Sequence, residues 1–484
     1  MQTGIVYLVG GGPGDAKLIT VKGREAIEKA DVIVYDRLVN PKLLEYARQD
    51  CEIIYGGKLP KHPVMKQEQL NDLLVAKACE GKVVVRLKGG DPGVFGRVGE
   101  EAEKLQTAGI DYEIVPGITS GIAAPAYAGI PVTHREFGNS FAMVSAHGNN
   151  GRDQPAVDWE SLKGIDTIAF YMGIANLPHI CKNLIDQGKS PDTPVILIQW
   201  GTYTRQKSLQ GTLSTIAERA AAEEFKNPAI ILVGDIVDLR SKINWFERKP
   251  LFGRQILLAR TANGESKLAE KLIEHGAEVI SYPKWKSTPA SIDSDLLHKL
   301  SSYDSVFFSS PESTACFFRV LVQSELDIRS IQANIHVQSE KSLKLLEDKG
   351  IKATISSLEE LPVRGLLVVK EVVKGEKSIS EDYDVFITNY KQMDEDYSSI
   401  FLQTLDTTIF DTVLFPSSAS VDTLIKGLEN STVNPEKFLE DKWTSCLGEK
   451  TRKTLESKGF QVDLMPEKPT IASYINELQK LSTK

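Results

Sequence analysis

Short apolar runs rich in β-branched residues alternate with amphipathic stretches along almost the whole chain. The runs are Ile5–Val9, Val32–Tyr35, Val83–Leu87, Thr167–Tyr171, Pro194–Ile198 and Ile230–Val233. Runs this short have the length of strands, and near-continuous apolar strands are typical of sheets covered by helices on both faces. The pattern predicts an α/β protein with largely parallel sheets.

A charged segment interrupts this alternation in the middle of the chain. Leu239–Arg254, LRSKINWFERKPLFGR, contains Pro and Gly among charged residues, a composition typical of linkers. A chain of 484 residues also exceeds what one hydrophobic core usually organises. We therefore predict a domain boundary near Lys249, with one domain over residues 1–246 and another over 250–484.

The second domain contains an internal repeat. Tyr303–Leu321 matches Phe410–Leu428, and Ser339–Ile355 matches Gly448–Leu464 at nearly the same offset. The first pair shares an acidic residue, an apolar strand, a Ser-rich turn and a helix. We expect two α/β lobes with a ligand cleft between them. The expected bounds are about 253–285 plus 395–484 for lobe A and about 286–385 for lobe B.

Composition and charge exclude several classes of protein. A net charge of −8 gives no basic field for nucleic acid, so an anionic substrate needs local clusters of Arg, Lys and backbone N–H groups. The five cysteines lack CxxC spacing and the seven histidines lack HxH or HExxH spacing, which favours reduced thiols and no metal site. The sequence shows neither a charged leader with an apolar core nor an apolar run of bilayer length, so we expect a cytoplasmic protein with no membrane partner.

A glycine-rich turn, VGGGPGD at Val9–Asp15, follows the first predicted strand. Its position suggests a dinucleotide-binding fold and hence a nicotinamide-dependent oxidoreductase. The match is poor, because Asp15 replaces the third glycine and Pro13 removes an N–H group from the phosphate-binding loop. A tight connection from strand to helix explains the glycines equally well.

Seven further segments occur in a fixed order through the first half. They are ADVIVYDRLV (Ala30–Val39), GGK (Gly56–Lys58), VVRLKGGDPGVFGRVGEE (Val84–Glu101), VPGITSGIAAPAYAGIPVTHR (Val115–Arg135), FYMG (Phe170–Gly173), IQWGTYTRQKSLQGTL (Ile198–Leu213) and NPAIILVGDIV (Asn227–Val237). Together they resemble the tetrapyrrole methylase family, and most closely its uroporphyrinogen-III C-methyltransferases, over essentially all of residues 1–240. The resemblance implies two α/β subdomains, a homodimer, and methylation of uroporphyrinogen III at C2 and C7 with S-adenosyl-L-methionine to give precorrin-2.

KGGDPGVFGR places three glycines after a strand, where the backbone must approach a ligand closely. A sulfonium loses its charge as the methyl leaves, so its site needs backbone carbonyls and apolar packing more than a counter-ion. Gly89, Gly90, Asp91 and Val94 are the predicted cofactor loop. By the family's pattern, the remaining cofactor residues are Pro13, Thr119, Ser120, Met172 and Gly201. For Met172 an ordinary core position explains the residue almost as well.

Attack by a pyrrole carbon requires alignment and then redistribution of a proton. Asp36 and Lys58 match the family positions for proton acceptor and proton donor, whereas a turn or capping aspartate beside Arg37 is the alternative for Asp36. The octacarboxylate substrate needs cations and N–H donors. The candidates are Arg37, Lys61, His62, Arg97, His134 and Arg135, each of which alone is equally a solvated surface charge.

Residues 250–484 resemble uroporphyrinogen-III synthase, through the strand and helix of Ile256–Pro283, two Ser-rich turns, CLGEKTRKTLESKGF and EKPTIASYINEL. The resemblance implies cyclisation of hydroxymethylbilane without a cofactor. Candidate carboxylate-binding residues are Ser309, Ser310, Ser417, Ser418, Gly448 and Thr451, with helix N-capping as the alternative. Tyr390 matches a cleft tyrosine that could assist departure of the hydroxyl, or it is simply a buried, hydrogen-bonded tyrosine.

Two departures from the synthase pattern affect lobe A and lobe B. Val337–Ser342 lacks the glycine usual in that turn, and Leu258–Thr261 lacks the following proline.

Three hypotheses stand for the whole chain: a bifunctional enzyme, a methyltransferase with a degenerate synthase-like module, and a nicotinamide-dependent oxidoreductase. The ordered set of Asp36, Lys58 and Gly89–Asp91 counts against the third, and we favour the first.

Overall fold

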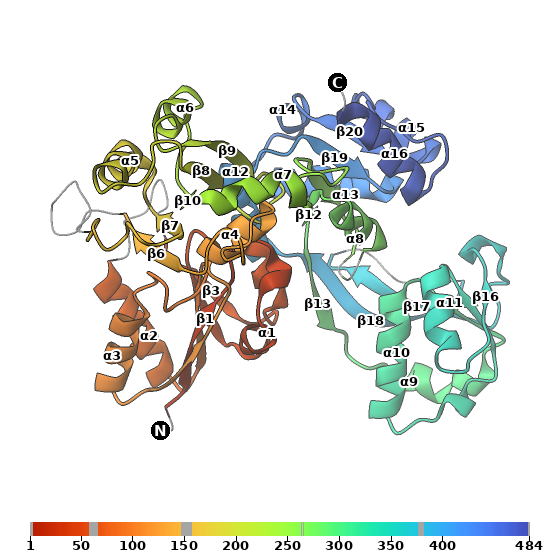
Figure 1. The fold of residues 1–484 in the computed structure, drawn as a ribbon. Helices are drawn as coiled ribbons and strands as arrows, with labels where there is room; N and C mark the ends of the chain where they lie inside the picture. Colours follow the sequence, from red (N-terminus) through yellow and green to blue (C-terminus); the bar gives the residue numbers. More distant parts are fainter. Residues whose placement is uncertain are drawn as a thin grey trace.

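The computed structural model describes residues 3–57, 66–146, 157–262, 264, 266–375 and 382–482. Over these residues the chain forms four β-sheets with helices packed on them, arranged in four bodies along the sequence (Figure 1). The predicted α/β class is confirmed. No helix among the described residues is both long and apolar enough to cross a bilayer.

The first body is a parallel sheet in the order β3-β2-β4-β1-β5. Its strands are β1 (Ile5–Gly10), β2 (Val32–Tyr35), β3 (Glu52–Tyr55), β4 (Val83–Lys88) and β5 (Asp111–Val115). Its helices are η1 (Ala16–Leu18), α1 (Val21–Lys29), η2 (Pro41–Tyr46), α2 (Gln67–Cys79) and α3 (Val98–Thr107). The apolar runs are buried on both faces of this sheet, which places all the strand-end loops at one edge.

The second body is a mixed sheet in the order β6-β7-β10-β8-β9. Its strands are β6 (Phe141–Ser145), β7 (Thr167–Tyr171), β8 (Pro194–Gln199), β9 (Lys207–Thr212) and β10 (Ala229–Val233). Its helices are α4 (Ser120–Tyr127), η3 (Ile174–Asn176), α5 (Leu177–Asp186), α6 (Ile216–Ala222), η4 (Asp235–Leu239) and α7 (Arg240–Ile243). The prediction of largely parallel sheets is wrong here, because only β6 and β7 pair in parallel. The link from β8 to β9 is too short for a parallel crossover.

Lobe A is a parallel sheet in the order β12-β11-β19-β20. Its strands are β11 (Gln255–Ala259), β12 (Glu278–Tyr282), β19 (Thr412–Phe415) and β20 (Trp443–Cys446). Its helices are α8 (Lys267–Glu274), α12 (Glu395–Thr407), α13 (Ser418–Asn430), α14 (Pro435–Leu439), α15 (Glu449–Ser457) and α16 (Ile471–Ser482).

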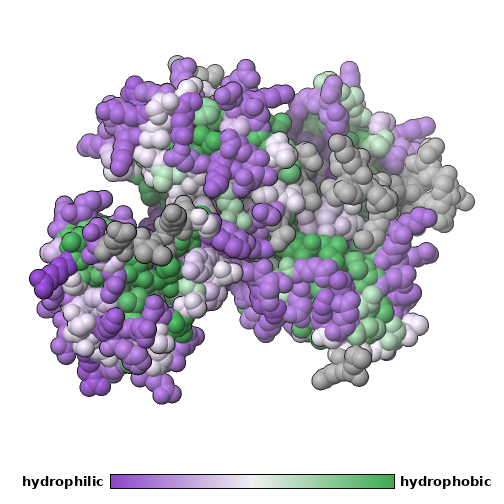
Figure 2. Space-filling view, turned by 180° about the vertical axis from the view of Figure 1, so that it is seen from behind, coloured by the Kyte–Doolittle hydropathy of each residue, from purple (hydrophilic) through white to green (hydrophobic). Residues whose placement is uncertain are grey.

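Lobe B is inserted between β12 and α12 and has the strand order β13-β18-β17-β14-β15-β16. Its strands are β13 (Trp285–Pro289), β14 (Ser305–Phe308), β15 (Asn334–Val337), β16 (Thr354–Ile355), β17 (Leu366–Val373) and β18 (Asp384–Met393). Its helices are α9 (Ser294–His298), η5 (Leu300–Ser302), α10 (Pro311–Gln323), η6 (Ile328–Ser330), α11 (Glu340–Glu347) and η7 (Leu358–Glu360). The antiparallel strands β13 and β18 connect the two lobes. Seen from behind, the surface is deeply indented between lobe B and the rest of the molecule (Figure 2).

The first body packs directly against lobe A. One continuous core includes Ile27 and Val9 of the first body together with Leu257 and Phe415 of lobe A. Glu45 of η2 forms an ion pair with Lys284 (2.9 Å) and accepts a hydrogen bond from the hydroxyl of Tyr397 (3.3 Å). The two halves of the chain therefore share a buried junction, which the sequence pattern did not predict.

Candidate active site

Three glycine-containing loops meet where β1, β4 and β5 end. The N–H of Gly90 donates to the carbonyl of Gly12 (2.7 Å), and the N–H of Gly12 donates back to Gly90 (3.1 Å). A Cβ at Gly10 would lie 2.6 Å from the backbone nitrogen of Gly117, so no side chain fits between these two loops. The glycines therefore allow backbone to approach backbone at the carboxyl edge of the sheet.

Asp91 holds this arrangement together. Its Oδ2 accepts a hydrogen bond from the N–H of Gly117 (2.9 Å), and its Oδ1 accepts one from the N–H of Gly93 (2.7 Å). Beside it, Gly90 has a φ of +69°, and a Cβ there would meet nothing closer than the Cα of Thr119 at 3.9 Å. The backbone at Gly90 thus faces open space bounded by Thr119 and Ser120.

The second body forms the opposite wall of this space through Tyr171. Its hydroxyl accepts from the N–H of Gly121 (2.7 Å) and lies 2.7 Å from the hydroxyl oxygen of Thr119. The ring of Phe95 packs edge-on against the Tyr171 ring at 4.9 Å between centroids, and the sulfur of Met143 lies 3.5 Å from the hydroxyl. The loop after β4 and the second sheet are therefore joined through one tyrosine.

Apolar side chains are exposed on this wall. Met172 follows Tyr171 with a φ of 55° and an exposed fraction of 43%, while Phe95 is 44% exposed. Because large apolar groups seldom stay in water without a binding role when they cluster, this surface suits an apolar or flat ligand. The alternative interpretation of Met172 as a core residue is wrong, since the side chain is exposed.

The remaining predicted cofactor residues support the walls. A Cβ at Gly201 would lie 2.3 Å from the Cβ of Ala124, so Gly201 lets its loop lie against α4. Val94 packs on the core that includes Ala124, and the half-buried Pro13 lies between Gly12 and Gly14 in the turn after β1. Gly89 directly follows β4 beside Leu38, and a Cβ added at Gly89 would lie 3.1 Å from the Cβ of Leu38.

Asp36 follows β2, and a buried cation contacts it. The Nη2 of Arg86 lies 2.5 Å from Oδ1 of Asp36, and the Nε of Arg86 lies 3.1 Å from Glu101. Lys88 lies 2.7 Å from the same Glu101 oxygen. Burial, together with the nearby charge of Arg86, lowers the pKa of Lys88 although Glu101 opposes the shift. This network is nearly inaccessible to solvent at all three residues, Arg86, Lys88 and Glu101. It therefore fixes the Asp36 carboxylate from the buried side.

The other charged candidates differ in their surroundings. Arg97 donates to Glu100 from Nε (2.8 Å) and Nη2 (2.6 Å). His134 accepts a hydrogen bond from the N–H of Glu136 in an exposed turn. Arg37 and Arg135 are exposed and contact no carboxylate within ion-pair distance among the described residues. Lys58, Lys61 and His62 lie outside the described residues.

The candidates in the C-terminal half cap helices. The hydroxyl of Ser310 accepts from the N–H of Ser313 (3.0 Å) at the start of α10, and Ser417 forms a capping box at the start of α13. Gly448 precedes α15. The capping alternative therefore describes Ser310 and Ser417 correctly, and their place at the carboxyl ends of β14 and β19 remains compatible with anion binding.

The other C-terminal candidates lie near the same loops. Ser309 donates its backbone N–H to Val369 (3.1 Å), Ser418 is the first residue of α13, and Thr451 is buried in the first turn of α15. Tyr390 lies on β18 and is 38% exposed, so the alternative of a buried tyrosine is wrong. A Cβ at Gly264, in the loop after β11, would lie 3.9 Å from Glu312 of α10. Lobe A and lobe B thus approach each other at their strand-end loops.

Two family models match the chain. The model of the Tetrapyrrole (Corrin/Porphyrin) Methylases matches residues 5–217, and that of Uroporphyrinogen-III synthase HemD matches residues 266–379 and 380–476. A uroporphyrinogen-III C-methyltransferase of Bacillus subtilis (strain 168) is 45% identical over 453 residues, which cover 93% of this chain and 92% of that protein. The chain belongs to the uroporphyrinogen-III C-methyltransferase family.

Another relative also matches both halves of this member of the uroporphyrinogen-III C-methyltransferase family. The porphyrin biosynthesis protein HemD of Ruminiclostridium josui is 34% identical over 509 residues, covering 99% of each chain. Among solved structures, the uroporphyrin-III C-methyl transferase of Thermus thermophilus in complex with S-adenosyl homocysteine is 35% identical, covers 48% of this chain and 93% of that chain, and has a TM-score of 0.42.

In this methyltransferase, sequence reasoning missed Tyr171, Phe95 and the network of Arg86, Lys88 and Glu101. Tyr171 and Phe95 occur inside the quoted motifs FYMG and GVFGR, so the motifs contained a signal for both. Arg86 and Lys88 alternate on β4 and therefore share one face of the strand. Two cations on one face of a buried strand indicate that a carboxylate partner lies nearby.

Proposed function

We propose that the N-terminal half transfers methyl groups from S-adenosyl-L-methionine to C2 and C7 of uroporphyrinogen III, giving precorrin-2. The observation that carries the proposal is the open space in front of Gly90, walled by Thr119, Tyr171 and the exposed Phe95 and Met172. The residues fit the cofactor, because backbone and apolar groups line the space. S-adenosyl-L-methionine supplies an electrophilic methyl group on a sulfonium.

The chain's own residues position the substrate and move its proton. Arg37 and Arg135 are exposed cations that pair with carboxylate arms of the macrocycle. Asp36 accepts the proton that a pyrrole ring releases after methylation, and Arg86 fixes the orientation of that carboxylate. Lys58 serves as the proton donor in this proposal, on the ground of its match to the family position.

Incubation of the purified chain with uroporphyrinogen III and S-adenosyl-L-methionine tests the proposal. We expect a product that has gained two methyl groups by mass, with one equivalent of S-adenosylhomocysteine for each methyl. A chain that binds S-adenosyl-L-methionine but leaves uroporphyrinogen III unmethylated would refute the assignment. Substitution of NAD for S-adenosyl-L-methionine in the binding assay separates this function from the oxidoreductase alternative.

A second activity is favoured by the arrangement of the C-terminal lobes. We propose that this half cyclises hydroxymethylbilane to uroporphyrinogen III, with the helix starts at Ser310, Ser417 and Gly448 holding carboxylates and Tyr390 assisting departure of the hydroxyl. The support is the approach of Gly264 in lobe A to Glu312 of α10 in lobe B. Folding the linear chain so that its ends meet is the main task of such an enzyme.

The full chain without S-adenosyl-L-methionine tests the second activity. Type III product formed from hydroxymethylbilane faster than in buffer supports a bifunctional enzyme. Product formation at the buffer rate supports the alternative, a methyltransferase with a degenerate synthase-like module. The homodimer through the N-terminal half and the cytoplasmic location stay predictions, and sedimentation of the purified chain tests the first of them.

A further inference from the structure

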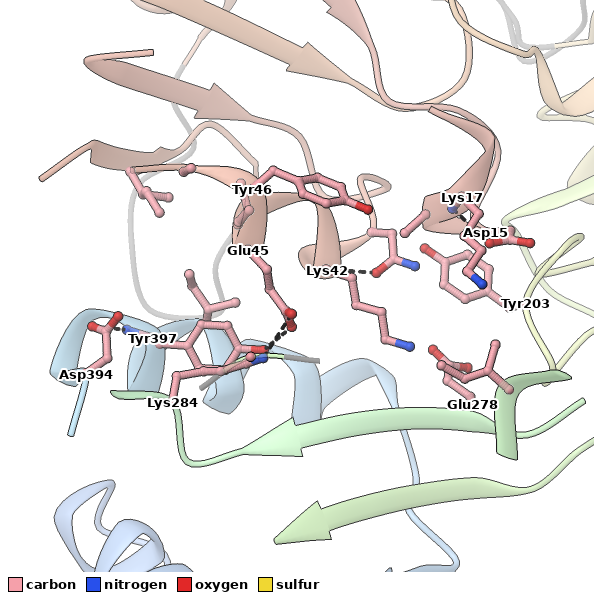
Figure 3. Close-up of a pocket in the computed structure, with 18 of the residues that line it drawn as sticks. Asp15, Lys17, Lys42, Glu45, Tyr46, Tyr203, Glu278, Lys284, Asp394 and Tyr397 are labelled. Atoms are coloured by element: carbon pink, nitrogen blue, oxygen red, sulfur yellow. Dashed lines mark hydrogen bonds and ion pairs between the residues drawn. The ribbon is translucent and has the colours of Figure 1, made fainter. Parts of the chain in front are cut away.

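A cavity of about 800 Å³ lies at the junction between the two halves (Figure 3). The N-terminal half lines it with Lys17, Lys42 and Glu45, and the C-terminal half lines it with Glu278, Lys284 and other residues. No predicted cofactor or catalytic residue lines it in the part of the chain that the structure describes. A volume near the upper end of the range for small-molecule sites leaves room for a large ligand.

The carboxylates that line this junction cavity already have partners. Glu45 is paired with Lys284 at 2.9 Å, and Asp394 with Lys286 at 3.4 Å. Glu274 is paired with Lys271 at 2.7 Å. Asp15 accepts from the hydroxyl of Tyr127 (2.8 Å), and Glu278 is buried with a hydrogen bond from Thr204 (3.4 Å). Lysines therefore compensate Glu45, Asp394 and Glu274, whereas the hydroxyls that donate to Asp15 and Glu278 leave the charge of these two carboxylates in place.

Three cations of the lining are not compensated in this way. Lys17, Lys42 and Lys249 contact no carboxylate within 4.0 Å among the described residues. Figure 3 shows the ammonium groups of Lys17 and Lys42 extending from the N-terminal half into the cavity. Lys249 lies over the rings of Trp245 and Phe246 at 5.5 and 5.7 Å. Three ammonium groups without a carboxylate partner outnumber the two carboxylates without an ion pair, Asp15 and Glu278, so the net charge left among the described residues is positive and favours an anion.

A smaller extension adjoins the junction cavity through shared lining residues. It has a volume of about 60 Å³ and shares Asn40, Lys42, Tyr203, Glu278 and Tyr397 with the junction cavity, and Arg37, the sequence neighbour of Asp36, is among its lining residues. A carboxylate arm fits such a space, but a macrocycle does not. Of the two spaces, only the junction cavity has room for a macrocycle.

We propose that the junction cavity binds one polycarboxylate tetrapyrrole, of the class that the C-terminal half produces and the N-terminal half consumes. Lys17, Lys42 and Lys249 pair with its carboxylates, and the smaller extension receives one arm. The inference rests on the proposed function for the identity of the ligand. It adds a binding site at the junction cavity, whose lining contains no predicted cofactor or catalytic residue among the described residues.

The test is a calorimetric titration, at a fixed salt concentration, of the full chain with uroporphyrin III, the stable oxidised form of the octacarboxylate. It measures the stoichiometry and affinity of binding. Two charge-reversal variants, Lys42→Glu with Lys249→Glu and Lys17→Glu with Lys249→Glu, are compared with Lys182→Glu, an exposed lysine of α5. Each lost charge-assisted contact weakens binding by about tenfold or more. Two different pairs guard against misfolding of either one, and circular dichroism checks both.

The expected result is the loss of one equivalent of bound porphyrin in both pocket variants and no change with Lys182→Glu. Methyl transfer to saturating uroporphyrinogen III stays at the wild-type rate in the pocket variants. Equal stoichiometry and affinity in all proteins would overturn the inference, as would equal weakening by Lys182→Glu. Absence of methyl transfer by the wild-type chain would instead refute the proposed function, and the two failures are therefore distinguishable.

Discussion

The guanidinium of Arg86 lies 2.5 Å from the carboxylate of Asp36, and the same side chain lies 3.1 Å from Glu101. Arg86 and Glu101 are buried, whereas the side chain of Asp36 is 34% exposed at the edge of the sheet. A charged group that is fixed by buried partners on one side and exposed to solvent on the other is suited to contact a substrate. The partly exposed Asp36 can therefore contact a substrate, whereas the buried Arg86 and Glu101 fix its position.

Replacement of Asp36 by Asn removes the proposed proton acceptor while keeping a side chain of the same size beside Arg86. We expect kcat for methyl transfer to fall by about 10²-fold or more, because general-base catalysis contributes on that order. Asp50, which is exposed and paired with Arg48 at 3.0 Å, is the control site. Unchanged kcat in Asp36→Asn, with Asp50→Asn as reference, would show that Asp36 is a turn residue only.

Glu101 and Glu100 are neighbours on α3 with opposite surroundings. Glu101 has no exposed side-chain area and is shared by Arg86 and Lys88, whereas Glu100 is 51% exposed and paired with Arg97. Breaking a buried pair costs roughly 3–5 kcal/mol, and an exposed pair contributes about 0–1 kcal/mol. Urea unfolding should therefore show a large loss for Glu101→Gln and almost none for Glu100→Gln. Equal losses would mean that the network does not stabilise the fold.

The network illustrates what the sequence could and could not predict. The strands β1, β2 and β4 of the first body follow from their apolar runs, and the glycine-containing loop after β4 follows from KGGDPGVFGR. The contact between positions 36, 86 and 101 depends on which strands lie side by side, and β2 pairs with β4 although β3 lies between them in sequence. Register across a sheet is a tertiary property that periodicity alone does not determine.

Ser310 and Ser339 cap the helices α10 and α11 in the same way, with hydroxyls that accept from the third helical N–H at 3.0 and 3.3 Å. Loss of either cap should lower the free energy of unfolding by about 1 kcal/mol. Only Ser310 is proposed to hold substrate, so Ser310→Ala alone should raise KM for hydroxymethylbilane. If Ser339→Ala raises KM equally, capping explains both effects and the binding role of Ser310 is wrong.

Glu371 of β17 gives lobe B a pH-dependent stability. Burial, assisted by nearby Glu312, raises the pKa of Glu371 against the opposing effects of Lys391 and Asn389. The folded state therefore binds the proton more tightly than the unfolded chain, so stability is lost as pH rises from the ordinary glutamate range of about 4.5. Glu371→Gln should remove this loss and be more stable than wild type at pH 8 but not at pH 4.

Unfolding of wild type, Glu371→Gln and Glu347→Gln in urea at both pH values checks this expectation. Glu347 is an exposed residue of α11 and serves as the control. A stability difference between Glu371→Gln and wild type that is the same at both pH values would contradict it.

The antiparallel second sheet and the junction between the halves show a further limit of the sequence. The apolar runs of β8 and β10 predict buried strands but not their direction, because direction depends on the connections. The junction joins Glu45 of η2 to Lys284 and Tyr397, residues in segments that the pattern treated as separate domains. Contacts between domains leave no periodic signal in either one.

We propose that the space in front of Gly90 holds the cofactor for methyl transfer. Comparison of substitutions at Gly90 and Gly109 tests this proposal. Gly90 and Gly109 have nearly the same backbone conformation, with φ of +69° and +68°, but an added Cβ at Gly109 meets nothing within 4 Å. Valine at either position costs comparable backbone strain, of about 1–2 kcal/mol.

The measurement is the binding of S-adenosyl-L-methionine and the rate of methyl transfer to uroporphyrinogen III in Gly90→Val and Gly109→Val. We expect Gly90→Val to lose cofactor binding and methyl transfer, while Gly109→Val keeps both near the wild-type values. Equal binding and equal rates in the two variants would contradict this proposal.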